Sequence, residues 1–320
     1  MASHQKSGLQ ELGNDAYAWL APRGTWGWSN AGLIVDGDQS LLVDTLFDLD
    51  LTDQMLRRMR DAAPQARDID TLVNTHANGD HCHGNELVEG ARIIASSASA
   101  AEMNELPPEA LAAIMDAAAD LGPVGDYLLH CFGEFRFHGI RQTPPSETFD
   151  GEMKLQVGDK PIKLIEVGPA HTRGDVLVHS PADRTVFTGD ILFIEGTPIM
   201  WQGPVGNWIK ACQLIEEMDV DHIVPGHGPI TGKVGVVAVR RYLEYVRDQA
   251  RQRYDAGMSA LDAARDIELA EYSAWSEPER IAVNVDTLYR EFTGVQAMTD
   301  VVELFSRMAE LAGFNASASD

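Results

Sequence analysis

The chain has 320 residues, enough for one large domain or two modest ones, and 44% of them are hydrophobic, so a sizeable core can form. It carries 49 acidic and 25 basic residues, and the net charge of -24 disfavours nucleic acid as a partner, because a polyanionic surface repels phosphate backbones. Three widely spaced cysteines fit neither a disulfide framework nor a four-thiolate zinc site.

The three unmatched cysteines favour a reducing compartment. The N-terminal residues are polar and lack the apolar run of a signal peptide. No stretch of about 18 consecutive apolar residues occurs, which argues against a membrane-spanning helix and against a membrane partner. We therefore expect a cytoplasmic protein.

Short apolar runs separated by turns rich in Gly and Asp predict strands in the first third of the chain. These strands are expected over residues 16–20, 31–35, 41–43, 71–73 and 91–95. Apolar residues at helical spacing predict a helix over 51–59. A region rich in Ala and acidic residues, about 97–138, predicts a helical insert.

The second half repeats the pattern of strands followed by helices. Strands are expected over residues 153–157, 160–167, 176–179, 185–188 and 223–224. A helix is expected over 206–218, and from about 235 onward the apolar spacing is helical throughout. Two clusters of strands, each followed by helices, favour two sheets with helices outside them.

A polar loop directly follows the strand expected at 71–73. It reads THANGDHCHGN over residues 75–85 and holds three histidines and one aspartate. Imidazole and carboxylate groups are the usual ligands of zinc and similar metals, and the glycines let the backbone turn tightly so that neighbouring side chains converge. Taken alone, the loop fits either a metal site or a solvated, His-rich loop.

Three later segments favour the metal site. The sequence GPAHTRGD places His171 between two expected strands, FTGD ends a strand with Asp190, and VPGHGP ends another with His227. Each segment has an apolar strand, then small residues, then a side chain that can bind a metal. Any one of them could be a turn Asp or an exposed His, but four such segments in this order indicate one site.

Together the four motifs resemble the metallo-β-lactamase superfamily, whose signature H-x-H-x-D-H is followed by later His, Asp and His positions. The resemblance spans about residues 15–230. It implies an α/β fold, an αββα sandwich of two mixed β-sheets with outer helices and a metal site at one edge. On this basis residues 1–234 form the catalytic domain, which includes the helical insert, and residues 235–320 form a helical extension packed on it.

The resemblance also implies the metal ligands. They are His76 and His171 for a first ion, Asp80, His81 and His227 for a second ion, and Asp190 as a bridge between the two. The second His of the signature is Asn78 here, and an amide oxygen is a weaker zinc ligand than imidazole. We therefore expect either one firmly bound ion at the second position or two ions with a labile first one.

Zinc is the expected metal, with iron or manganese as alternatives, and Asn78 is expected at the first ion or against the substrate. His83 is expected to support the ligands rather than replace the missing histidine. A bound ion lowers the pKa of water to about 7 and acts as a Lewis acid on a carbonyl oxygen. Asp80 or Asp190 would orient the attacking water as the catalytic residue. These features predict a metal-dependent hydrolase that uses a metal-bound hydroxide.

Tryptophans near the expected metal edge bear on the substrate. Trp26, Trp28 and Trp201 are candidates for an apolar or aromatic pocket, and simple core packing is the alternative. Such a pocket would suit a small ester, lactone, thioester or halogenated aromatic substrate. The insert and the C-terminal extension either cap the site or mediate dimerisation, so a homodimer is left open.

Two other functions stay open at this point. Some relatives use the same scaffold with iron, so an iron-dependent oxidoreductase is one alternative. The other is a non-catalytic metal-binding relative, which the departure at Asn78 keeps open. Metal analysis separates these readings, since zinc supports hydrolysis and iron supports redox chemistry.

Overall fold

The computed structural model describes residues 7–295 and 297–315, and its first sheet has seven strands. The strands follow one another across this sheet in chain order, antiparallel as far as β4 and parallel from β4 to β7. They are β1 (Gly8–Gly13), β2 (Ala16–Leu20), β3 (Ala31–Asp36), β4 (Gln39–Val43), β5 (Thr71–Val73), β6 (Arg92–Ser96) and β7 (Glu147–Phe149).

The second sheet has five strands in the order β12-β11-β10-β9-β8. Its strands pair antiparallel, except that β11 and β12 run parallel. They are β8 (Glu152–Val157), β9 (Lys160–Glu166), β10 (Val176–Ser180), β11 (Thr185–Phe187) and β12 (His222–Val224). Both sheets are therefore mixed.

The core between the sheets follows from the side-chain alternation of the strands. Along β9, Ile162 and Leu164 are buried while their neighbours Pro161 and Lys163 are exposed, as expected for a strand with one covered face. The inward residues of β8 to β12 pack against Ile34 and the other inward residues of the first sheet. This shared core makes the two sheets a sandwich.

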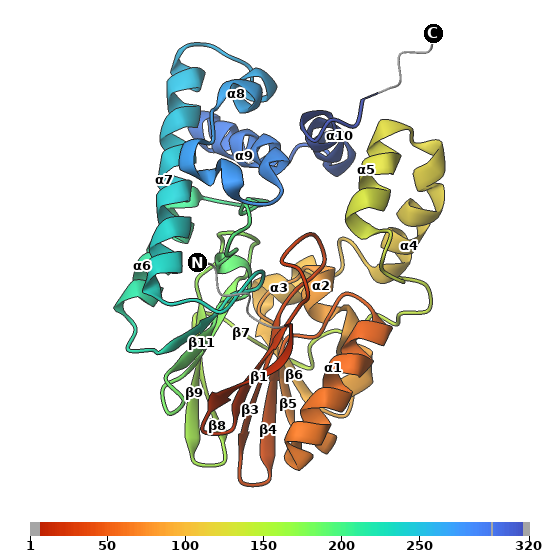
Figure 1. Cartoon of the computed structure of the whole chain (residues 1–320), viewed down its shortest axis with the longest axis vertical. Helices are drawn as coiled ribbons and strands as arrows, with labels where there is room; N and C mark the ends of the chain where they lie inside the picture. Colours follow the sequence, from red (N-terminus) through yellow and green to blue (C-terminus); the bar gives the residue numbers. More distant parts are fainter. Residues whose placement is uncertain (1–6, 296, 316–320) are drawn as a thin grey trace.

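The helices cover the outer faces and build a layer beyond one end of the sandwich (Figure 1). They are α1 (Leu49–Ala62), α2 (Gly79–Cys82), α3 (Ser97–Glu102), α4 (Pro108–Ala117), α5 (Pro123–Phe132), α6 (Val205–Glu217), α7 (Lys233–Asp255), α8 (Ala260–Asp266), α9 (Ile281–Thr293) and α10 (Val301–Leu311). Short 3-10 turns lie at Pro64–Arg67, His83–Val88, Ala118–Asp120, Gly189–Ile191, Ala270–Ala274 and Pro278–Arg280.

Helix α1 shows how the sequence sets these elements. It begins at Asp48, whose side chain accepts a hydrogen bond from the Leu51 backbone N–H at 2.8 Å. Its buried residues Met55 and Met59 pack on the outer face of the first sheet against Leu33. The strands beneath it are therefore covered on both faces, which explains why β2 and β3 are nearly continuous apolar runs.

The predicted fold class, an αββα sandwich with further helices, is confirmed, and most predicted elements lie within a few residues of the observed ones. Strands β1 and β7 were not predicted. Strand β1 is a half-exposed edge strand, so its apolar pattern is weak, and β7 has three residues. The loop predicted at 76–85 contains α2 and the start of a 3-10 turn.

The predicted insert at 97–138 consists of α3, α4 and α5 followed by irregular chain, and the C-terminal extension consists of α7 to α10 as far as residue 315. Residues 316–320 of that extension lie outside the described part. The division at residue 234 into two units stays a prediction, as does the cytoplasmic location. Among the described residues, no helix is both long and apolar enough to cross a membrane.

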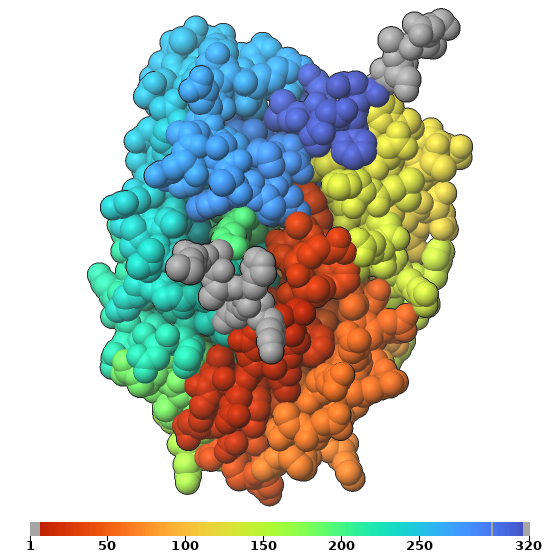
Figure 2. Space-filling view, viewed as in Figure 1, coloured from red at the N-terminus to blue at the C-terminus, as the bar shows by residue number. Residues whose placement is uncertain are grey.

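Figure 2 shows how the insert and the extension meet. The C-terminal helices (blue), the insert (yellow) and the N-terminal part of the chain (red) come together above the end of the sandwich. The contacts agree with the view, because α10 packs against both α5 and α9. This junction lies over the strand ends that carry the predicted ligands.

Candidate metal centre

Three predicted ligands stand at equal distances past the ends of three strands. His76 follows β5, Asp190 follows β11 and His227 follows β12, each by three residues. The loop between β9 and β10 supplies His171, and α2 supplies Asp80 and His81. The structure brings all six together into two groups, which we call the metal cluster.

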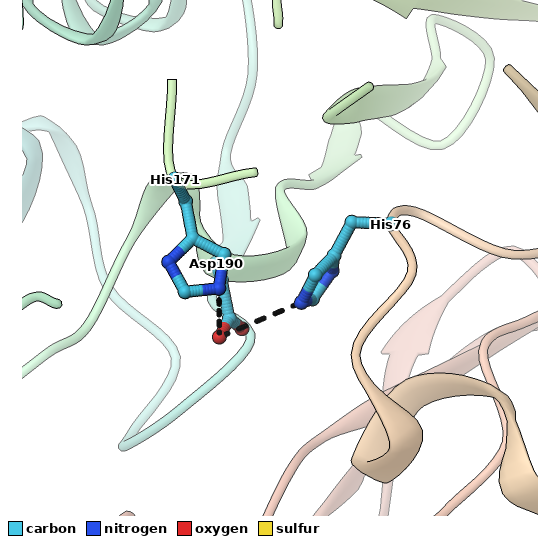
Figure 3. Close-up of side chains that lie close together, drawn as sticks. All are labelled: His76, His171 and Asp190. Atoms are coloured by element: carbon cyan, nitrogen blue, oxygen red, sulfur yellow. Dashed lines mark ion pairs between the residues drawn. The ribbon is translucent and has the colours of Figure 1, made fainter. Parts of the chain in front are cut away.

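The first group consists of His76, His171 and Asp190, whose ligand atoms all lie within 4.8 Å of one another. Nε2 of His171 lies 3.3 Å from Oδ2 of Asp190, and Nε2 of His76 lies 3.7 Å from the same oxygen. Figure 3 shows that the three side chains point toward one another from three separate segments. All three are buried.

The second group consists of Asp80, His81 and His227, again within 4.8 Å of one another. Nε2 of His227 lies 3.3 Å from Oδ2 of Asp80 and 3.3 Å from Oδ2 of Asp190. Oδ1 of Asp190 lies 3.1 Å from Nε2 of His81. The Asp190 carboxylate therefore lies between the two groups, at the bridging position that the sequence predicted.

Each histidine of the cluster has its Nδ1 atom held from outside. The partners are Thr75 Oγ1 for His76 at 3.0 Å, Asp44 Oδ2 for His81 at 3.0 Å, the Ile199 carbonyl for His171 at 2.7 Å, and the Trp28 carbonyl for His227 at 3.1 Å. In the neutral ring, an oxygen acceptor at Nδ1 places the single proton there and leaves the Nε2 lone pair for a metal ion. All four Nε2 atoms face the interior of the cluster.

The unsatisfied atoms of the cluster fit bound cations. Nε2 of His76, Nε2 of His81 and Oδ1 of Asp190 are buried and have no hydrogen-bond partner of good geometry among the described residues. Buried polar atoms are normally hydrogen-bonded, and an ion would satisfy these three together. A donor set of imidazoles and carboxylates suits zinc and related metals. The residues therefore fit one or two metal ions.

The electrostatics of the cluster point the same way. Burial and the nearby His81 hold the pKa of His76 well below its usual range. Burial disfavours the charged form of His227, but Asp190 and Asp80 outweigh it and raise the pKa of His227 to about 9. Burial also opposes ionisation of Asp80, yet His81 and His227 lower the pKa of Asp80 to about 2. The ionised carboxylates of the metal cluster therefore stabilise positive charge between the two groups.

Asn78 lies beside the first group, where the sequence placed it. Its Oδ1 lies 2.8 Å from Nε2 of His171. Since Nδ1 of His171 donates to Ile199, the neutral ring turns a lone pair toward Asn78. An oxygen and a lone pair at this distance would be compatible with a cation close to both, so Asn78 lies beside the atoms that would hold a first ion.

His83 and Cys82, the further side chains of the loop that could bind a metal, stay outside the cluster. The His83 ring lies 5.5 Å from the Phe47 ring, and burial lowers the pKa of His83 to about 4. The Cys82 thiol donates to the Asn78 carbonyl at 3.3 Å. His83 therefore packs behind the ligand loop and does not replace the missing histidine.

Asp44 is a residue that the sequence reasoning missed. It accepts hydrogen bonds from the Thr75 backbone N–H and the Thr75 hydroxyl, both at 2.7 Å, as well as from His81. Its backbone has φ of 62°, a conformation uncommon outside glycine. The available signal was its place directly after the apolar strand β4.

Close backbone approach also shapes the cluster. A Cβ atom on Gly226 would lie 2.0 Å from Oδ1 of Asp190, so only glycine fits one residue before His227. Gly189 has φ of +49°, and a Cβ there would lie 2.5 Å from the Thr75 hydroxyl. The small residues of the ligand motifs are therefore required by the packing of one motif on another.

The three tryptophans of the predicted pocket separate into two places. The Trp26 ring centroid lies 5.6 Å from Phe132 of α5, 5.8 Å from Phe305 of α10 and 6.5 Å from Trp201. We call these four residues the aromatic cluster. Trp28 packs apart from them, 5.2 Å from Phe135, and its carbonyl holds His227.

Stacked side chains connect the aromatic cluster to the metal cluster. The Phe193 ring lies parallel to the His227 ring, with centroids 5.0 Å apart and planes 1° apart. The guanidinium of Arg280 lies 5.3 Å from the Phe193 ring and 4.1 Å from the Trp26 ring. Arg280 of the C-terminal extension thus contacts Phe193, which in turn contacts the predicted ligand His227.

Comparison with known proteins adds independent observations. The chain is 23% identical over 224 residues to a Beta-lactamase-like protein 2 homolog of Caenorhabditis elegans, covering 70% of this chain and 63% of that protein. It is 23% identical over 203 residues to the alpha subunit of the 2,4-dinitroanisole O-demethylase of Nocardioides sp. strain JS1661, covering 61% of this chain and 51% of that protein.

Among solved structures, the stereoselective inverting sec-alkylsulfatase of Pseudomonas sp. superposes with a TM-score of 0.69 at 15% identity, covering 90% of this chain and 50% of that one. This likeness bears on the fold alone. The chain spans less than two thirds of the length of each of these three proteins.

The sequence profile of the family described as Metallo-beta-lactamase superfamily matches residues 24–227. The match takes in every residue of the metal cluster and more than half of the chain. The protein therefore belongs to the metallo-β-lactamase superfamily, and it has two His/Asp groups that could each hold a metal ion.

Proposed function

We propose that this protein is a metal-dependent hydrolase of a small apolar or aromatic substrate, with zinc at one or both groups of the metal cluster. The observation that carries the proposal is the convergence of four imidazole Nε2 atoms and two carboxylates at a buried point beside the aromatic cluster. When bound, zinc supplies a water of lowered pKa and a Lewis acid for a carbonyl oxygen.

Asp80 is the better placed of the two carboxylates to orient the attacking water. Its side chain is 13% exposed, whereas the other five ligands are exposed by 4% or less. Both oxygens of Asp190 face histidines of the cluster, Oδ1 at 3.1 Å from Nε2 of His81 and Oδ2 at 3.3 Å from Nε2 of His171. Asp190 is therefore proposed as the bridging ligand and Asp80 as the residue that holds the water and moves its proton.

The aromatic cluster supports the proposed substrate class. Its four rings come from the N-terminal loop, α5, the loop after Asp190 and α10, and they pack together, buried or partly buried, where the insert meets the extension. This region is proposed as an apolar cap whose surface lines the substrate pocket. Such a surface disfavours highly charged substrates because it cannot solvate them. One relative named above is a subunit of a 2,4-dinitroanisole O-demethylase, whose substrate is a small aromatic molecule. Aryl esters, lactones, thioesters and halogenated aromatics are the proposed candidates.

Metal analysis of the protein as isolated, combined with a substrate panel, tests this function. We expect zinc, turnover of aryl or apolar esters, lactones or thioesters, or of chloroaromatics, and loss of turnover on chelation that added zinc restores. Iron without hydrolysis of any panel member would support the oxidoreductase alternative. A protein that binds metal but turns over no substrate would support the non-catalytic alternative.

A paired substitution tests the proposed pocket. Phe305→Ala removes a ring of the aromatic cluster, so KM for aryl substrates should rise while metal content stays unchanged. Phe292→Ala on α9 serves as the control, because that ring packs on Tyr254 at 5.4 Å, away from the cluster. Equal effects of the two substitutions on KM would contradict the pocket assignment.

A further inference from the structure

Helix α9 holds the segment 197–205, which lies between Asp190 and α6. Arg280, Asn284, Thr287 and Glu291 are spaced four, three and four residues apart, so they share one helix face. Arg280 donates to the Thr197 carbonyl at 2.9 Å, and Thr287 donates to the Met200 carbonyl at 2.7 Å. Asn284 donates to the Pro198 carbonyl at 2.9 Å and accepts from the Met200 N–H at 2.7 Å. Glu291 accepts from the Val205 N–H at 2.8 Å.

Asn284 has a special position in this series, because its amide brackets one residue. Its Nδ2 donates to the carbonyl before Ile199 and its Oδ1 accepts from the N–H after Ile199. The Ile199 carbonyl between them is the acceptor for Nδ1 of His171, at 2.7 Å. The amide of Asn284 therefore fixes the peptide groups on both sides of the atom that orients a predicted ligand.

The Asn284 amide is itself fully fixed. The residue is 1% exposed, and its Nδ2 also donates to the Tyr242 hydroxyl at 3.0 Å, so both of its donor hydrogens and its acceptor are used. The same segment holds the His171 loop by its backbone, since the Gln202 N–H donates to the His171 carbonyl at 3.1 Å. A rigid path thus runs from α9 to the His171 ring.

The other histidines of the metal cluster do not depend on this path. Nδ1 of His81 is held by Asp44, and Nδ1 of His227 by the Trp28 carbonyl, both on the N-terminal side of the chain. Nδ1 of His76 is held by the adjacent Thr75. A change at Asn284 should therefore affect the first group through His171 and leave the second group intact.

We infer that Asn284 is a positioning residue for His171, which acts through the Ile199 carbonyl and sets the metal affinity of the first group. The inference rests on the proposed function of that group as a metal site. Outer partners of ligating histidines typically change metal affinity by about 10- to 100-fold. The C-terminal extension would then contribute to the metal site as well as to the cap.

Titration of the metal-free full chain with zinc tests the inference. The unmodified chain should bind a tight and a weaker ion, assigned to the second and first groups. Asn284→Ala should weaken the weaker step by about tenfold or more and the tight step by less than about threefold. Val285→Ala, at a fully buried neighbour on α9 without a polar side-chain group, is the control and should leave the ratio of the two affinities unchanged even where it lowers Tm.

A second readout does not require metal. In the metal-free chain, the Nδ1 proton of His171 should give a protected imidazole NMR signal in the unmodified protein and in Val285→Ala, and should exchange rapidly in Asn284→Ala. This signal decides the inference if the unmodified chain binds one ion only. No zinc binding at all by the unmodified chain would contradict the proposed function. An unchanged affinity ratio or an unchanged His171 signal in Asn284→Ala would overturn the inference.

Discussion

Oδ2 of Asp44 lies 3.0 Å from Nδ1 of His81, so a buried carboxylate outside the metal cluster fixes a histidine within it. The other two bonds of Asp44 go to Thr75, whose hydroxyl in turn accepts from Nδ1 of His76. One acidic residue at the end of β4 therefore orients one histidine in each group. This arrangement of a carboxylate behind a ligating histidine is common in metal sites.

Asp44→Asn should weaken zinc binding by about 10- to 100-fold. The amide would present an N–H group to the hydroxyl of Thr75 or to Nδ1 of His81, both of which donate to Asp44 now. Zinc titration measures the effect. Asp116→Asn is the control, because that side chain is 65% exposed, and affinities equal in the two variants would refute the role given to Asp44.

His81→Ala and His227→Ala should each abolish tight metal binding and turnover. Each removes an Nε2 atom of the second group and leaves two of its three ligands. Metal content after gel filtration and initial rates are the measurements. His138→Ala, at an imidazole paired with Asp116 on the surface, should change neither. Full metal content and rate in either ligand variant would show that the ligand assignment is wrong.

Asn78→His should raise occupancy of the first group. The amide already lies 2.8 Å from Nε2 of His171, and imidazole is a stronger zinc ligand than an amide oxygen. The number of zinc ions bound per chain at limiting zinc measures the effect, with Asn104→His at an exposed position as the control. Unchanged stoichiometry would count against this placement of Asn78.

Gly226→Ala should destabilise the chain by about 1–3 kcal/mol and reduce metal content, because the added methyl group would displace Asp190 or Gly189. Thermal unfolding and metal analysis report both effects. Gly206→Ala is the matched control, since a Cβ there meets nothing within 4 Å and Gly206 lies in α6. A Gly226→Ala variant as stable and as metal-rich as the control would contradict the packing argument.

The stabilisation that zinc gives should grow as the pH rises from about 6.5 to about 9. In the metal-free chain the pKa of His227 is raised to about 9, against an ordinary value of about 6.5. The proton on His227 therefore stabilises the folded metal-free chain fully below pH 6.5, and this stabilisation is lost as the pH passes 9. Zinc bound to His227 replaces this proton and stabilises the folded chain in its place at high pH as well. The zinc-induced rise in Tm should therefore be larger at pH 9 than at pH 6.5.

Tm of the metal-free and zinc-loaded chain across this pH range is the measurement. The His227→Ala variant should show a smaller pH dependence of Tm in the metal-free chain over this window. His81, whose burial lowers its pKa less than Asp190 and Asp80 raise it, accounts for a remaining part. A zinc-induced shift that stays constant or shrinks toward pH 9 would rule out displacement of a proton from His227.

The ligand residues could be predicted because they follow a local pattern. His76, Asp190 and His227 each stand three residues past an apolar strand, and strand ends that share an edge bring such residues together. Asp44 shows the limit of this reasoning. It ends an apolar strand as well, but it is one of many acidic residues, and its role depends on the crossing of two loops.

The hydrogen bonds that backbone carbonyls make to the ligands could not be predicted from the sequence either. The carbonyls of Ile199 and Trp28 hold His171 and His227, and any residue type has a carbonyl. The polar face of α9 was hidden for another reason. Its apolar residues predict a packed helix, but only the fold shows that Asn284 meets the segment 197–205.

Anomalous diffraction from crystals of the zinc-loaded chain is the most direct test of the metal cluster. We expect a strong zinc peak at coordination distance, roughly 2.0–2.2 Å, from Nε2 of His81, Nε2 of His227 and a carboxylate oxygen of Asp80. A second peak, equal or weaker, is expected beside His76, His171 and Asn78. Zinc bound elsewhere on the chain, with the Nε2 atoms of these histidines free of metal, would contradict the account.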